Sequence, residues 1–127
     1  MKRLMMTTLF LLILTGCASN VALKDSADVT QAVGTLSLSW LQANSMEVTL
    51  EGKRYVGEWT SEPCLNEYCR GVYRNVQKLH RRHIDKGYAI LKSKDGGQLE
   101  CVWVSHLPDV QGECRAQDGR QFRLKAG

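Results

Sequence analysis

The chain has 127 residues, 43% of them hydrophobic and 24% charged, which suits one small domain and excludes a wholly disordered or fibrous protein. The formal net charge is +4, and it falls to +2 without the two basic residues Lys2 and Arg3. So small a charge argues against a nucleic-acid-binding protein.

The first 16 residues have the features of a signal peptide. Lys2 and Arg3 precede an uncharged apolar stretch from Leu4 to Leu14. A helix that spans a bilayer needs about 20 apolar residues, so this stretch is too short to be one and has the length of a secretory core. We therefore expect residues 1–16 to be removed on export.

The next signal is a lipidation motif. The segment Leu14-Thr15-Gly16-Cys17 resembles the lipobox of bacterial lipoproteins, which ends in an obligatory cysteine. The resemblance implies cleavage after Gly16, a diacylglycerol thioether on Cys17 and acylation of the new amine, and several acyl chains hold a protein firmly at a membrane. Ala18, and not aspartate, follows the cysteine, so the resemblance implies the outer membrane. We expect the domain to face the periplasm, and the sequence leaves the surface orientation open as the alternative. An ordinary signal peptide with a chance cysteine is the alternative.

Residues 17–34 are small and polar and predict a lipidated tether. Within them, Asp25, with Asp28 three residues later, can cap a short helix that ends at Gly34. A disordered spacer fits the same composition.

Residues 35–127 predict one mainly β domain, an antiparallel sandwich or small barrel of six or seven strands built from hairpins. The period-two pattern begins with Leu36, Leu38 and Trp40, which alternate with polar residues. A two-residue type II′ turn at Gly52-Lys53 is the first predicted hairpin turn, and it sets Leu50 opposite Tyr55.

The C-terminal third contains two similar segments, residues 95–101 and 118–124, each starting with Asp-Gly. We expect each to close a three-residue hairpin loop with its glycine at positive φ. The resulting registers place Ala89 opposite Cys101, Cys114 opposite Phe122, and Cys101 opposite Cys114.

These registers gather apolar residues on one face of the sheet, and a slip of one residue would invert the pattern. Ile90 and Val102 are exceptions, because they fall on the polar face. The residues of the apolar face are Ala89, Leu91, Leu99, Cys101, Trp103, Cys114, Ala116, Phe122 and Leu124.

A partial resemblance to MORN repeats, whose pattern is G-x-x-Y-x-G-x-W, is found in residues 52–59 (GKRYVGEW) and in the more degraded segment 112–122. It implies stacked two-stranded hairpins and carries over no binding residues.

Apart from Cys17, the chain has four cysteines, which allow three connectivities. Export to an oxidising compartment favours disulfides, and we expect Cys64–Cys69 and Cys101–Cys114. Zinc at the C-x4-C spacing is the alternative, and no metal is expected. The histidines available to such a site are His80, His83 and His106.

We expect residues 61–86 to be an inserted helix or a long loop, and a helix capped by Asn75 and ended by Gly87 is favoured. The segment is basic and can contact an anionic partner, although a solvated face is the simpler reading. The candidate contact residues are Arg70, Arg74, Lys78, Arg81, Arg82 and Lys86.

No catalytic or nucleotide-binding motif is present, and the three tryptophans occupy predicted core positions. We therefore expect a non-enzymatic interaction or envelope-assembly lipoprotein without cofactor, whose partners are the membrane, through Cys17, and a protein or anionic envelope component. The second possibility is an inhibitor of a lysozyme-type enzyme, because lipoproteins of that kind have a similar size and localisation. The S-A-S-G-x-x-Y stretch of such inhibitors is absent from this sequence. An envelope hydrolase is the third possibility.

Overall fold

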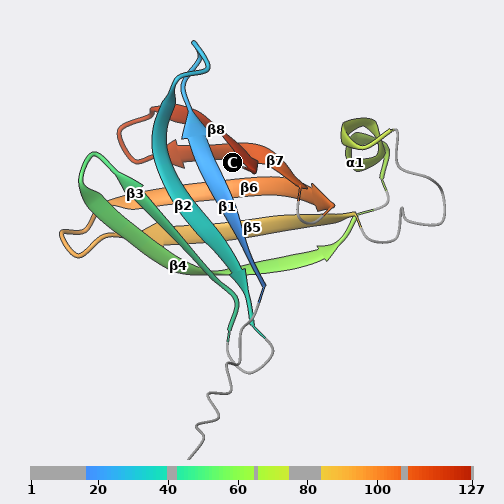
Figure 1. Cartoon of the computed structure of the whole chain (residues 1–127), viewed down its shortest axis with the longest axis horizontal. Coiled ribbons are helices and arrows are strands. Elements are labelled where there is room, and N and C mark those ends of the chain that lie inside the picture. Colours follow the sequence, from blue (N-terminus) through green and yellow to red (C-terminus); the bar gives the residue numbers. More distant parts are fainter. Residues whose placement is uncertain (1–16, 40–42, 65, 75–83, 107–108, 127) are drawn as a thin grey trace, which may run out of the picture.

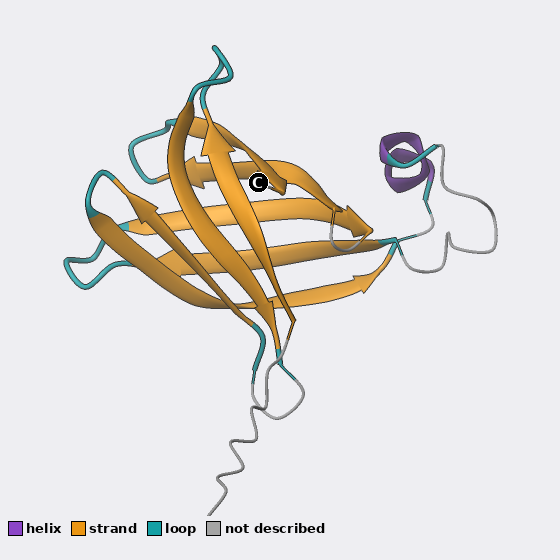
Figure 2. Cartoon of the chain, in the orientation of Figure 1, coloured by secondary structure: helices purple, strands orange, loops and turns teal. Residues whose placement is uncertain are grey.

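The structure, a computed structural model, describes residues 17–39, 43–64, 66–74, 84–106 and 109–126, and its strands form one antiparallel sheet that closes into a barrel (Figure 1). A single short helix lies outside the barrel wall within this described part (Figure 2). The elements are β1 (Cys17–Lys24), β2 (Thr30–Leu38), β3 (Ser45–Leu50), β4 (Lys53–Pro63), α1 (Glu67–Val72), β5 (Asp85–Lys92), β6 (Gln98–His106), β7 (Asp109–Ala116) and β8 (Gln121–Ala126).

Each strand pairs with the next one in the sequence, and β8 pairs with β1 to close the barrel. This up-and-down order gives the barrel two rims. The turns β1–β2, β3–β4, β5–β6 and β7–β8 form the hairpin rim. The starts of β1, β3, β5 and β7 and the ends of β2, β4, β6 and β8 form the α1 rim.

The expectation of a mainly β antiparallel domain is confirmed, but the domain is an eight-stranded barrel and not a six- or seven-stranded one. The difference comes from residues 17–34, which form β1 and part of β2, so the predicted tether is wrong. Val21 and Leu23 face the core and are almost fully buried. The barrel therefore begins at residue 17, and not at residue 35.

The helix predicted after Asp25 is also wrong, for a local reason. The Asp25 carboxylate accepts hydrogen bonds from the backbone N–H groups of Ala27 (2.9 Å) and Val29 (3.0 Å). A short acidic side chain can satisfy free N–H groups in a turn as well as at a helix start. Here it does so in the β1–β2 turn.

The first predicted hairpin has the correct inward face and the wrong turn. Leu50 pairs with Lys53, and not with Tyr55, so the turn residues are Glu51 and Gly52. Both have positive φ (54° and 79°), as a type I′ turn requires, and this turn matches the twist of the strands. Because the slip is two residues, Leu50 and Tyr55 still point into the barrel, where both are buried.

The C-terminal registers are confirmed. Cys101 pairs with Ala89 on one side and with Cys114 on the other, and Cys114 pairs with Phe122. The turn glycines Gly96 and Gly119 have φ of 93° and 94°. Every residue of the predicted apolar face is buried.

The barrel interior is a packed core. Trp59 and Trp103 meet edge to face, with ring centroids 5.8 Å apart. Gly87 and Gly112 flank Trp103 on the neighbouring strands, and a Cβ at Gly87 would lie 2.2 Å from the indole ring. These positions leave the space that the large ring occupies. Trp40 lies outside the described residues.

The inserted segment contains a helix, but not the predicted one. α1 is capped by Asn66, whose side chain accepts a hydrogen bond from the Cys69 N–H (3.0 Å). Residues 75–83, where the favoured helix was placed, lie outside the described residues. Gly87 was expected to end that helix and lies instead within β5.

Candidate functional site

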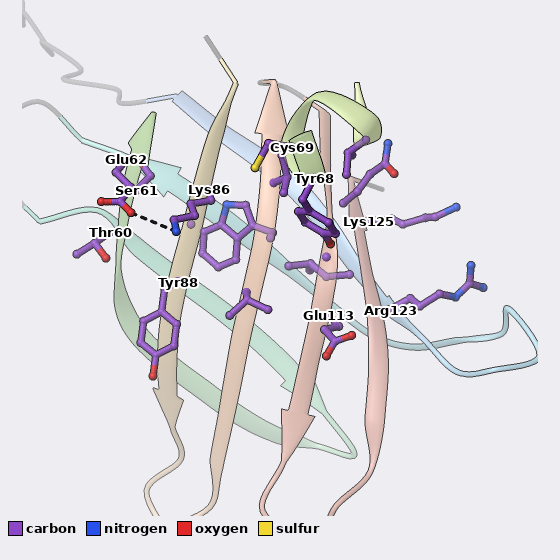
Figure 3. A pocket seen from close by; sticks show the side chains of 18 of the residues that line it. Thr60, Ser61, Glu62, Tyr68, Cys69, Lys86, Tyr88, Glu113, Arg123 and Lys125 are labelled. Atoms are coloured by element: carbon purple, nitrogen blue, oxygen red, sulfur yellow. Dashed lines mark ion pairs between the residues drawn. The ribbon is translucent and has the colours of Figure 1, made fainter. Parts of the chain in front are cut away.

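A groove of about 1160 Å³ crosses the outside of the barrel beneath α1, and we call it the outer-wall groove (Figure 3). Its floor consists of two rows of outward-facing side chains, each continued from strand to strand by the pairing register. The first row is Thr60, Tyr88, Val102, Glu113 and Arg123. The second row is Glu62, Lys86, Val104, Gln111 and Lys125.

A small second core holds α1 over this floor. Cys69 and Tyr73 pack with Ile84 and with Val104, the outward residue of β6 that they cover. The Tyr73 hydroxyl donates a hydrogen bond to the Val104 carbonyl oxygen (3.2 Å). The Cys64–Cys69 disulfide ties the start of the helix to the end of β4. The overhang is therefore fixed by packing, a hydrogen bond and a covalent bond.

The Tyr73 hydroxyl remains a donor over the whole physiological pH range. Its burial raises its pKa above the ordinary value of 10.0, and the nearby carboxylate of Asp109 raises it further. A neutral phenol suits a position among apolar side chains.

The centre of the groove exposes apolar and aromatic surface. Tyr68 is 73% exposed, Tyr88 41% and Val102 45%. Tyr68 extends from α1 on one side of the groove, and Tyr88 rises from β5 on the other (Figure 3). The Tyr88 hydroxyl donates to Glu100 (2.8 Å), which fixes the orientation of its ring, and this hydrogen bond raises the pKa of Tyr88.

The two ends of the groove are charged. On the β4–β5 side, Lys86 forms an ion pair with Glu62 (3.4 Å), marked by the dashed line in Figure 3. On the β7–β8 side, Glu113, Arg123 and Lys125 point outward. An apolar centre with a charged periphery is the usual arrangement of a protein–protein contact surface.

Both expected disulfides are confirmed, Cys64–Cys69 and Cys101–Cys114. The zinc alternative for these cysteines is wrong, because their sulfur atoms are bonded to each other. Among the described residues, no three His, Cys, Asp or Glu side chains are grouped to hold a metal ion. No helix in this part of the chain is long and apolar enough to cross a membrane.

Only part of the predicted basic contact lies within the described residues. Arg70 belongs to α1, Arg74 follows it, and Lys86 lines the outer-wall groove. Residues Lys78, Arg81 and Arg82 lie outside the described residues, as do His80 and His83. Cys17 is the first residue of β1, where it pairs with Leu38.

Two residues of the groove floor stand out in the sequence: Val102, which the sequence analysis named as an exception, and Tyr88, which it did not name. Val102 breaks the polar pattern of the outer face, and it lies at the centre of the floor. Tyr88 lies opposite it on β5. Tyr68 gives no periodic signal, because it belongs to a one-and-a-half-turn helix whose placement depends on tertiary contacts.

No protein-family model, no curated protein and no solved structure matches this chain.

Proposed function

We propose that this protein is a small non-enzymatic lipoprotein of the outer membrane that binds a partner protein in the outer-wall groove. The observation that carries the proposal is the exposed apolar centre formed by Tyr68, Tyr88 and Val102 between charged ends. Tyrosines supply large contact areas with little loss of side-chain entropy, and they are enriched where proteins meet. The barrel wall holds Tyr88 and Val102 in place before the partner arrives, and the second core with the Cys64–Cys69 disulfide holds Tyr68.

The charges around the groove favour an acidic partner. In the groove itself, Lys86 pairs with Glu62 (3.4 Å), and Arg123 pairs with Asp28 (2.5 Å). Lys125 lies on the same side as Glu113, so the excess of positive charge comes from the neighbouring helix. Arg70 and Arg74, both exposed, add positive charge on and after α1. Such charges steer an oppositely charged surface toward the site. In this proposal the predicted basic contact and the groove serve the same partner.

The membrane anchor in the proposal rests on the lipobox resemblance at Cys17. Acyl chains attached at the first residue of β1 would hold the α1 rim next to the membrane, since no tether separates Cys17 from the barrel. The outer-wall groove opens on the wall below this rim. Partners near the membrane surface would therefore be the accessible ones.

Two matched substitutions test the proposal in intact cells. Val102 and Val33 are both exposed valines of the barrel wall, on β6 and on β2, on opposite sides of the eight-stranded barrel. Val102→Glu places a charge in the apolar centre and should abolish a discrete crosslinked adduct of the wild-type protein. Val33→Glu should leave the adduct unchanged. An adduct that survives Val102→Glu, or that is lost equally in both variants, contradicts the proposal.

An enzyme inhibitor is the second candidate, and the constrained segment around α1 favours it. Inhibitors act through rigid elements that lose little freedom on binding. Here the Cys64–Cys69 disulfide and the second core hold Tyr68 in a projecting position. The test is inhibition of lysozyme by the purified protein, with Tyr68→Ala as the matched variant. Inhibition that Tyr68→Ala removes supports this function, and absence of inhibition excludes lysozyme as the target.

A further inference from the structure

A second, smaller recess lies at the other end of the barrel, on the hairpin rim. The β3–β4 and β5–β6 hairpins diverge beyond the pair formed by Val56 and Lys92, and the space between them has a volume of about 630 Å³. Figure 1 shows these two turns at the end of the barrel away from α1. We call this recess the basic notch. Its lining residues are Lys53, Arg54, Val56, Lys92, Ser93, Lys94 and Asp95.

The notch is lined by four basic side chains and one acidic side chain. Two of the basic groups have partners: Lys53 pairs with Asp95 (2.8 Å), and Arg54 pairs with Glu47 (2.6 Å). In the described part of the chain, no acidic side chain forms an ion pair with Lys92 or Lys94. These two ammonium groups are therefore available to an external anion.

One of these pairs bridges the notch. Lys53 and Asp95 join one hairpin to the other across the recess. Asp95 is held in turn by the Ser93 hydroxyl and the Gly97 N–H. The exposed side chain of Val56 and the aliphatic stems of the lysines supply apolar contact beside the charges. A ligand that carries carboxylates on a partly apolar scaffold fits this lining.

The notch and Cys17 lie on opposite rims. β4 alone has 11 residues, which at ~3.3 Å per residue and a barrel tilt of ~40° separates the rims by roughly 25–30 Å. If Cys17 is lipidated, as in the proposed function, the notch faces away from the anchoring membrane. The anionic material in that direction is the cell wall, and not the lipid headgroups at the anchor.

We propose that the basic notch binds the carboxylates of peptidoglycan through Lys92 and Lys94. The orientation in this proposal rests on the proposed function, whereas the charge and shape of the notch do not. The protein would then hold a partner at the groove near the membrane while its far rim contacts the cell wall. The two contacts use different residues, which lie at opposite ends of β4 and β5.

Sedimentation with isolated peptidoglycan sacculi tests the notch. The full chain, purified in non-ionic detergent, is expected to sediment with sacculi at low ionic strength and to be released as salt screens the charges. Lys92→Gln together with Lys94→Gln should lower the apparent affinity about threefold to tenfold, as expected for the loss of two exposed ion pairs. Lys24→Gln with Arg115→Gln removes the same charge outside both the notch and the groove and should leave sedimentation unchanged.

Three other results would contradict binding of peptidoglycan by the notch. Failure of the wild-type protein to sediment, equal losses in both double variants, or preferential binding to lipopolysaccharide vesicles would overturn the proposal. A thermal melt of each variant confirms that the barrel is intact. The Val102→Glu variant should sediment like the wild-type protein. Loss of sacculus binding with an unchanged crosslinked adduct would leave the proposed function standing, so the two proposals fail separately.

Discussion

At the residue scale, the two buried tryptophans of the core differ in their hydrogen bonding. The indole N–H of Trp59 donates to the carbonyl oxygens of Ser37 (3.1 Å) and Ser45 (3.0 Å). The indole N–H of Trp103 is buried and has no hydrogen-bond partner among the described residues. A buried donor without a partner loses its hydration without compensation. The two rings therefore stabilise the same core to different extents.

Replacing each tryptophan by phenylalanine should reveal this difference. Trp59→Phe removes apolar volume and leaves two carbonyl oxygens without their donor, whereas Trp103→Phe removes volume and an unpaired donor. We expect Trp59→Phe to lower the free energy of unfolding by about 1–2 kcal/mol more than Trp103→Phe does. Urea unfolding of both variants measures this directly. Equal losses, or a larger loss in Trp103→Phe, would contradict the hydrogen-bond assignment.

Asp95 provides a pH-dependent contribution at the same scale. Hydrogen bonding to Lys53, then to Ser93 and Gly97, holds the pKa of its carboxyl well below the ordinary value of 3.8. A carboxyl whose pKa is lower in the folded state stabilises the fold above its unfolded pKa. That contribution is lost as the pH falls through the unfolded pKa toward the folded one.

Asp95→Asn should therefore lower stability at neutral pH, and the difference from wild type should shrink as the pH falls below about 4. Urea midpoints of the two proteins, compared from pH 7 to pH 2, test this expectation. Because the pair is exposed, added salt should reduce the neutral-pH difference. A difference that does not change with pH would show that Asp95 acts through something other than its charge.

At the scale of elements, the two disulfides stabilise different parts of the structure. Cys101–Cys114 joins β6 to β7 inside the main core, and the bonded residues are 13 positions apart in the sequence. The residues of the Cys64–Cys69 disulfide are 5 positions apart in the sequence, and this bond belongs to the second core under α1. The first bond should stabilise the whole barrel, and the second should mainly fix the overhang of the groove.

Cys101→Ala with Cys114→Ala should lower the free energy of unfolding by about 2–4 kcal/mol. Cys64→Ala with Cys69→Ala should leave exchange of the barrel amides unchanged and accelerate exchange in α1. Hydrogen exchange measured on the intact protein distinguishes these effects. Faster exchange throughout the barrel in the Cys64/Cys69 variant would contradict the division into two cores.

The hairpins also show which elements could be predicted from the sequence. The last two hairpins were predicted with their correct registers, because each Asp-Gly turn has one preferred geometry and the cysteine pair ties them together. The turn at Gly52 was placed one residue late because Glu51 adopts a positive φ, which is uncommon for a residue with a side chain. Local chemistry can indicate such a turn but does not identify its first residue.

At the scale of the whole molecule, closure of the barrel depends on contacts that the sequence pattern does not reveal. Val21 to Lys24 of β1 pair with β8, about one hundred residues later. Residues 17–34 contain few large apolar side chains, so their burial in the barrel was not predicted. The outer-wall groove has the same origin, since its two rows unite five strands and its overhang depends on the second core. Of the residues that line it, the sequence singled out Val102 as an exception on the polar face and Lys86 as a predicted contact residue.

The central claim is that a partner contacts the barrel wall beneath α1, and a position-specific photocrosslinker tests it most directly. The photoreactive residue replaces Tyr68 in one variant and Val33, on the opposite wall, in the other, and both proteins are irradiated in intact cells. We expect one discrete adduct from position 68, absent when Val102→Glu is added, and none from position 33. Adducts at position 33 of equal yield, or no adduct at position 68, would contradict the account.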